Sequence, residues 1–94
     1  LSFYDPDTEK FPALALAYQA LEKGGNMPCI MNAANEAAVA AFLQEKIDFY
    51  DITDVVSRCM ESVDFIAVPD IDDIFGTNDT AFAKAKEYIN KISR

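Results

Sequence analysis

The alanine-rich run from Met31 to Leu43 limits what this chain can fold into more than any other segment. Apart from Asn32, Asn35 and Glu36, its residues are small or apolar. Alanine is the best helix former and allows a neighbouring helix to approach closely. Asn32 can cap the first turn with its side-chain oxygen, and Glu36 places a negative charge near the helix start. The run predicts a buried, closely packed helix from about Asn32 to Glu45. One side of this helix carries Asn35, Val39, Phe42 and Leu43.

A first helix is expected ahead of this run, beginning at Pro12 and ending at Gly24-Gly25. Its apolar face, at spacings of 0, +3, +4 and +7, consists of Leu14, Ala17, Tyr18 and Leu21. Residues 1–10 have no helical period, and residues 5–8 have the composition of a turn. We therefore expect an extended arm at the N-terminus, with Phe3 and Tyr4 packed against the domain. Residues 26–30 are expected to connect the first two helices.

A third helix is expected from Tyr50 or Asp51, because it has the clearest amphipathic pattern in the chain. Its apolar face consists of Ile52, Val55, Val56, Cys59, Met60 and Val63. The preceding link should anchor Ile47 and Phe49 in the core. Residues 65–68 have the composition of a strand, but Pro69 follows and no partner strand is visible. A single strand is not stable alone, so we expect an extended, packed connector.

The last part of the chain predicts a short helical turn from Asp70 to Phe75, capped by Asp70 and closed by Gly76. A final helix capped by Thr77 or Asn78 should follow. Its inward face is expected to carry Phe82, Ala85, Ile89 and Ile92, and its outward face Lys84, Lys86, Lys91 and Arg94. The predicted fold class is all-α. Residues 1–94 form one small domain resembling a four-helix bundle, with an extended N-terminal arm and one short extra helical turn.

The formal net charge of −8 opposes binding to nucleic acids or anionic membranes, which require a basic surface. No apolar run approaches the ~18–20 residues of a membrane span. From Cys59 to Ala83 the chain carries acids and no base, which indicates either solvated surface or docking to a basic partner. Cys29 and Cys59 do not form a CxxC pair, and we interpret them as reduced core residues rather than as a disulfide.

The residues that carry most enzyme chemistry are missing. The chain has no histidine, and its three glycines belong to no nucleotide-binding motif. Residues 70–76 fail as a calcium loop, because Phe75 stands where glycine is needed. Glu36 is better explained as electrostatic support of a helix start than as a lone acid or base. Residues 78–80 match a glycosylation sequon, a short motif without other support. The four serines lack the Asp-Ser-Leu context of acyl carrier proteins: Ser2, Ser57, Ser62 and Ser93.

One stretch of the sequence resembles a known family. The run Asn32-Ala33-Ala34-Asn35-Glu36 is followed by Ala41-Phe42-Leu43 and then by Phe49-x-Asp51-Ile52. Together with Leu1-Ser2-Phe3, Pro6-Asp7, Phe11-Pro12, Leu14, Leu16-Ala17, Gly24, Ala38-Val39 and Ile47, this pattern is similar to the C-terminal domain of deoxyxylulose phosphate reductoisomerase. Residues 68–79 and the basic-tailed final helix follow the family more loosely.

The resemblance implies a larger enzyme of which residues 1–94 are the C-terminal helical domain. In that family an N-terminal Rossmann domain binds NADPH, and a central domain holds Mg²⁺ or Mn²⁺ through carboxylates. The enzyme converts deoxyxylulose phosphate to methylerythritol phosphate in isoprenoid biosynthesis, and we expect a cytoplasmic homodimer. The catalytic, cofactor-binding and metal-binding residues of the family lie upstream, so none is expected in this fragment. Its expected role is structural, packed against the remainder of the same chain.

Two alternatives remain open at this stage. The chain could be a free-standing acidic helical module that binds a protein partner, which predicts a contiguous exposed apolar groove. A fragment cut from an enzyme could also expose the face that met the rest of the enzyme, and self-associate through it.

Overall fold

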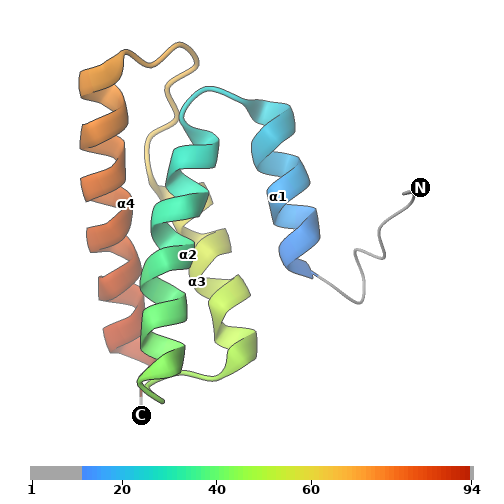
Figure 1. Cartoon of the computed structure of the whole chain (residues 1–94), viewed down its shortest axis with the longest axis vertical. Helices are drawn as coiled ribbons and strands as arrows, with labels where there is room; N and C mark the ends of the chain where they lie inside the picture. The colour runs from blue at the N-terminus through green and yellow to red at the C-terminus, as the bar shows by residue number, and fades with distance from the viewer. Residues whose placement is uncertain (1–11, 94) are drawn as a thin grey trace.

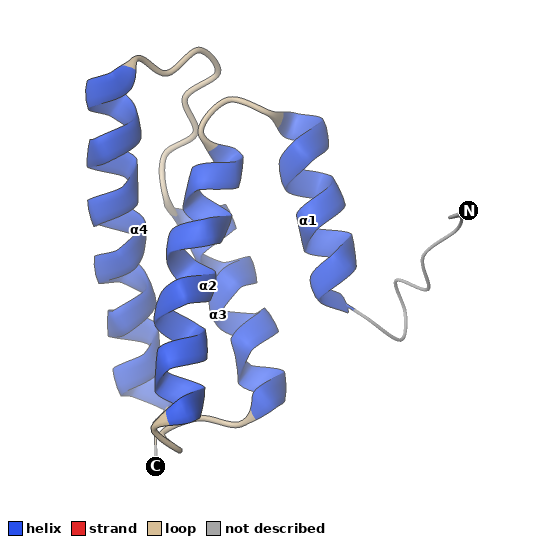
Figure 2. Ribbon diagram, in the orientation of Figure 1, coloured by secondary structure: helices blue, strands red, loops and turns tan. Residues whose placement is uncertain are grey.

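The computed structural model describes residues 12–93. These residues form four α-helices joined by connectors, and no strand (Figure 2). The helices are α1 (Pro12–Lys23), α2 (Met27–Leu43), α3 (Phe49–Ser62) and α4 (Ile71–Ile92). Consecutive helices run in opposite directions, and α2 lies between α1 and α4 (Figure 1). The predicted all-α, four-helix class is therefore confirmed. The predicted N-terminal arm lies outside the described residues, as does Arg94.

The core is built around the alanines of α2. The buried residues of α2 are Met27, Ile30, Ala33, Ala34, Ala37, Ala38 and Ala41. They pack against Val55, Val56 and Cys59 of α3 and against Ala81, Ala85 and Ile89 of α4. Small side chains on both α2 and α4 allow the two helices to approach closely. Of the side of α2 that carries Asn35, Val39, Phe42 and Leu43, only Phe42 packs against this core, and Leu43 is 73% exposed.

The predicted start of α2 was wrong. The helix begins at Met27 with Asn26 as its N-cap residue, so Asn32 lies inside the helix, exposed, and residues 27–30 are helical rather than a connector. Pro28 does not prevent this, because the first N–H groups of a helix have no partner within the helix. At the other end Glu45 has φ of 62°, which is incompatible with a continuing helix.

The bounds of α1 were predicted correctly, but its inward face was not. Ala20 is buried and Leu16 packs against the core, whereas Tyr18 is 51% and Leu21 70% exposed. The apolar periodicity was present, but α1 is rotated so that the stripe containing Ala17 and Leu21 does not face its own core. This stripe is therefore available for contacts outside the described residues.

The apolar face of α3 was predicted correctly, with Val55, Val56, Cys59 and Val63 buried and Ile52 and Met60 packed at the edge of the core. The helix begins at Phe49 with a capping box between Asp48 and Asp51, in which the Asp48 N–H donates to Asp51 Oδ2 at 2.8 Å. Ile47 is buried as predicted. Phe49 is not a core residue: it is 64% exposed, with its ring edge-on to Phe42 at a centroid distance of 5.7 Å.

The connector and α4 differ in part from the prediction. Residues 65–68 form no strand, as expected, but Val68 is exposed rather than packed. Asp70 caps α4 as predicted, accepting from the Asp73 N–H at 2.8 Å. The helix then continues through Gly76, so the separate short turn and the second cap at Thr77 or Asn78 were wrong. Phe82, Ala85 and Ile89 face inward as predicted, whereas Ile92 is largely exposed.

Because Gly76 lies inside a continuous helix, its replacement by alanine is expected to stabilise the protein. A Cβ at this position would meet no atom within 4 Å. Glycine inside a helix is roughly 0.5–1 kcal/mol less favourable than alanine. The Gly76→Ala variant should therefore unfold at a higher urea concentration, followed by circular dichroism. A loss of stability would show instead that Gly76 divides α4 into two helices.

Candidate functional site

The most extensive set of polar contacts among the described residues surrounds Asn26, which is fully buried. Its Nδ2 donates to the carbonyl oxygen of Asp64 and to Thr77 Oγ1, each at 3.0 Å. Its Oδ1 accepts from the Ile66 N–H at 2.8 Å, and its own backbone N–H donates to the Ile66 carbonyl at 2.9 Å. One residue at the start of α2 thus fastens the α1–α2 turn to the α3–α4 connector and to α4.

Gly25 allows this close approach. Its φ is +57°, and a Cβ at this position would overlap the carbonyl oxygen of Ile66 and touch the ring of Phe65. Glycine is therefore required both by the backbone conformation and by the space. From the sequence, Gly25 was expected to end the first helix, and Asn26 was placed in the connector without a role. The available signal was an asparagine between a Gly-Gly pair and a proline, which is a plausible N-cap context.

Both cysteines are free and face α4. The Cys59 thiol donates to the Ala81 carbonyl at 3.8 Å, and the Cys29 thiol to the Ile74 carbonyl at 3.5 Å. Burial raises the pKa of Cys59 to about 11, although Lys84 opposes the shift, and burial also raises the pKa of Cys29. A nucleophilic cysteine needs a lowered pKa, so these thiols are packing groups, as the sequence indicated.

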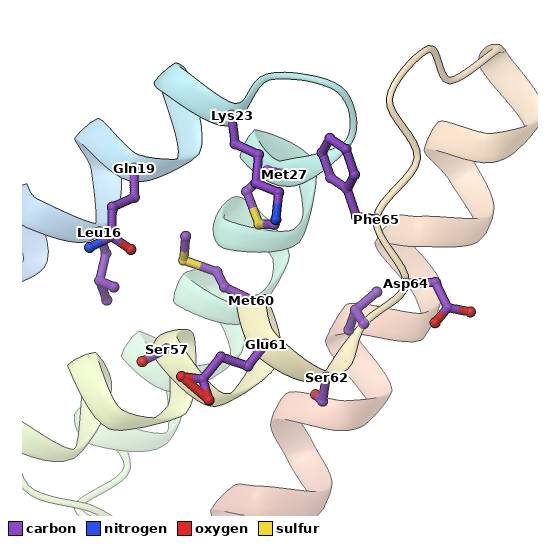
Figure 3. Close-up of a pocket in the computed structure, with 11 residues that line it drawn as sticks. Leu16, Gln19, Lys23, Met27, Ser57, Met60, Glu61, Ser62, Asp64 and Phe65 are labelled. Atoms are coloured by element: carbon purple, nitrogen blue, oxygen red, sulfur yellow. The ribbon is translucent and has the colours of Figure 1, made fainter.

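The largest hollow described lies between α1, the C-terminal half of α3 and the connector (Figure 3), with a volume of about 450 Å³. Met60 extends from α3 toward α1, and Lys23 lies beside Phe65, its Nζ 4.7 Å from the ring centroid. The residues that line the hollow are Leu16, Gln19, Lys23, Met27, Ser57, Met60, Glu61, Ser62, Val63, Asp64 and Phe65.

The described residues that line this hollow form no catalytic arrangement. Glu61 and Asp64 are exposed to solvent, and the hydroxyls of Ser57 and Ser62 form no hydrogen bond with a general base within residues 12–93. Nucleophilic catalysis needs such a pair. In the same part of the chain, no cluster of three or more histidine, cysteine, aspartate or glutamate side chains could hold a metal ion.

Of the residues considered for chemistry, Ser57 and Ser62 line this hollow, whereas Glu36 and Asn78 are exposed on α2 and α4 and do not. Asp70 and Asp73 form the capping box of α4, which agrees with their interpretation as caps rather than calcium ligands. Among the described helices, none is both long and apolar enough to cross a membrane.

The fold and these contacts define a class of protein: a small helical packing domain held together by a buried asparagine. The family model for the DXP reductoisomerase C-terminal domain matches residues 1–84, and the chain belongs to this family. It is 52% identical over 87 residues to the 1-deoxy-D-xylulose 5-phosphate reductoisomerase of Halothermothrix orenii, covering 93% of this chain and 23% of the relative. It is 51% identical over 89 residues to that of Bacteroides thetaiotaomicron, covering 95% and 23%.

A solved structure gives the same result. The 1-deoxy-D-xylulose 5-phosphate reductoisomerase from Zymomonas mobilis in complex with NADPH matches 94% of this chain with a TM-score of 0.83 and 42% identity, over 23% of its own length. The chain therefore spans about a quarter of the length of these relatives.

Proposed function

We propose that residues 1–94 serve as the C-terminal structural domain of a 1-deoxy-D-xylulose 5-phosphate reductoisomerase. The observation that carries this proposal is the match of nearly the whole chain, at about half identity, to a single region of such enzymes. The whole enzyme would use NADPH to rearrange and reduce deoxyxylulose phosphate to methylerythritol phosphate in isoprenoid biosynthesis. It would act as a cytoplasmic homodimer.

In this proposal NADPH and the divalent metal, Mg²⁺ or Mn²⁺, are bound by the upstream part of the enzyme. The composition of residues 1–94 supports this part of the proposal. The sequence has no histidine and no glycine-rich phosphate loop, and the described residues offer no metal-binding cluster. These residues do not fit either group, so we assign no catalytic, cofactor-binding or metal-binding residue to the fragment. Its contribution is a rigid surface, whose shape is fixed by the alanine core and the Asn26 contacts.

A domain exchange tests this function. Residues 1–94 would replace the corresponding C-terminal domain of the Halothermothrix orenii reductoisomerase, and NADPH oxidation would be followed with deoxyxylulose phosphate as substrate. We expect the turnover rate of the chimera to lie within about tenfold of that of the parent enzyme, because the proposal places the catalytic groups in the upstream part, which is unchanged. A tenfold change corresponds to only about 1.4 kcal/mol of transition-state stabilisation. The enzyme truncated before this domain is the control.

Two results would count against the proposal. One is a folded chimera with no more activity than the truncated enzyme. The other is calorimetric titration in which the isolated chain binds NADPH or Mg²⁺ with micromolar affinity, since the upstream part should bind both. The alternative of a free-standing interaction module predicts the first result, because such a module has no reason to restore a reductoisomerase.

A further inference from the structure

Helix α1 exposes an apolar stripe that the other described residues do not cover. Ala17 and Leu21 lie one turn apart on the same face, and Tyr18 adjoins them. Leu21 and Tyr18 are among the most exposed large apolar residues on this helix. Periodic apolar residues on a helix normally mark the face that it buries. The orientation of α1 leaves this face unburied within residues 12–93.

The same side of α1 borders an apolar groove of about 220 Å³ between α1, α2 and α3. The groove is lined by Leu16, Ala17, Met31, Asn35, Ile52, Thr53 and Val56. None of these side chains is charged, although charged residues are 26% of the chain and line the three other hollows described. We call the groove together with Tyr18 and Leu21 the α1–α2 face.

Asn35 supplies the polar group of the α1–α2 face. It is exposed at the groove and makes no side-chain hydrogen bond within the described residues. Its carboxamide offers two donors and an acceptor. An apolar groove with one orienting polar group is suited to an apolar segment whose backbone can hydrogen-bond to the amide.

We propose that the α1–α2 face docks the upstream part of the same polypeptide, through an apolar segment that enters the groove. This inference rests on the proposed function. The family model describes a C-terminal domain, so in the relatives about three quarters of the polypeptide precede this domain. Because α1 is the first helix of the described residues, the preceding chain joins the domain on the N-terminal side of α1. A segment joined to the domain there has a raised effective concentration at the surface of α1.

Other exposed apolar residues are less suited to this role. Phe42, Phe49 and Tyr50 stack edge-on at the α2–α3 corner, with centroid distances of 5.7 and 5.9 Å, and so already bury part of their surface against one another. Neither Phe49 nor Tyr50 lines any hollow described. Among the faces described for residues 12–93, the α1–α2 face combines an uncharged groove with an exposed apolar stripe.

Two matched variants of the domain-exchange chimera test the docking. Leu21 and Leu43 are 70% and 73% exposed, and both lie in the last turn of their helices, where a lysine suits the helix dipole. In the isolated chain, Leu21→Lys and Leu43→Lys should leave the thermal midpoint nearly unchanged. In the chimera, Leu21→Lys should lower the midpoint by at least about 4 °C, because a charge replaces a buried leucine, while Leu43→Lys should not.

Hydroxyl-radical footprinting gives an independent readout on the unsubstituted chimera. The Tyr18 ring should be oxidised at least about threefold more slowly in the chimera than in the isolated chain, because burial on docking removes solvent from it. Equal oxidation rates, or equal midpoints of the two lysine chimeras, would overturn the docking proposal. Sedimentation of the isolated chain should show a monomer. A dimer that protects Tyr18 equally well would assign the face to a second copy and overturn it too.

These results separate the two proposals. An active chimera in which Leu21→Lys has no effect rejects the docking face and leaves the domain assignment intact. A folded chimera that protects Tyr18 but has no more activity than the truncated enzyme supports the docking face and rejects the proposed function.

Discussion

The Asn26→Ala variant is expected to lose about 3 kcal/mol of unfolding free energy. Alanine removes the donors to the Asp64 carbonyl and the Thr77 hydroxyl and the acceptor of the Ile66 N–H. A buried polar group left without a partner costs roughly 1–3 kcal/mol. Water can reach some of these groups, because Asp64 is exposed and Ile66 is half-buried. Small domains have about 5–15 kcal/mol in total, so urea unfolding followed by circular dichroism should show a large shift.

The matched control is Asn32→Ala, the same change at an exposed position of the same helix. It should alter stability by no more than about 0.5 kcal/mol. If the two variants unfold at the same urea concentration, the Asn26 contacts do not stabilise the fold as proposed here.

Asn26→Asp keeps the size of the side chain but places a carboxylate oxygen where Nδ2 now faces the Asp64 carbonyl. Burial raises the pKa of such a carboxyl above its unfolded value, because desolvation disfavours the charged form. The folded state then binds protons more tightly than the unfolded state, so the deficit relative to the unsubstituted protein should shrink as the pH falls. A protonated carboxyl also regains a donor.

Local patterns in the sequence were sufficient for several elements. Pro12 and Gly24 mark the ends of α1, and the spacing from Ile52 to Val63 identifies the buried face of α3. Asp70 is recognisable as a cap from its position before an apolar run. In each case the information lies within one or two helical turns, so no knowledge of distant contacts is needed.

The errors arose where distant contacts decide the outcome. Asn26 occupies the N-cap position of α2, but its side chain makes no capping hydrogen bond and instead bonds to residues 38 to 51 positions away in sequence. No local pattern reports such partners. The start of α2 was placed at Asn32, because no local pattern shows that residues 27–31 continue the helix and bury Met27 and Ile30 in the core. Gly76 suggested a break, but a continuous helix on both sides tolerates the modest cost of one glycine.

The candidate site follows a similar division. The resemblance to the reductoisomerase C-terminal domain is confirmed by the family match, whereas the expectation that this fragment carries no catalytic residue stays a prediction. The α1–α2 face could not be predicted, because the apolar stripe of α1 read as a core-facing stripe. Only the rotation of α1 in the folded chain shows that Leu21 is exposed.

Helix α1 leads into the turn that Asn26 fastens. Gly24 and Gly25 connect α1 directly to that residue, and the backbone pair between Asn26 and Ile66 fixes where the turn lies on the connector. The position of the proposed docking face should therefore depend on the hydrogen bonds of Asn26, in the turn that follows the C-terminal end of α1. A change in this turn should disturb docking as well as stability.

Gly25→Ala is accordingly expected to lose at least about 3 kcal/mol of unfolding free energy. A left-handed backbone costs a non-glycine residue about 1–2 kcal/mol. The new Cβ would also overlap the Ile66 carbonyl, which must move away and give up its hydrogen bond from the Asn26 N–H. Urea unfolding of the isolated chain measures the loss. In the domain-exchange chimera, Tyr18 should become more reactive to hydroxyl radicals than in the unsubstituted chimera.

Gly24→Ala separates the two causes of this loss. Gly24 has φ of +69°, but a Cβ there would meet nothing within 4 Å, so only the backbone cost of about 1–2 kcal/mol should appear. The difference between the two variants measures the close approach to Ile66. The Gly25→Ala/Asn26→Ala double variant should lose less than the sum of the single losses, because both disrupt the link to Ile66. Equal losses for Gly24→Ala and Gly25→Ala would show that backbone conformation alone explains both glycines.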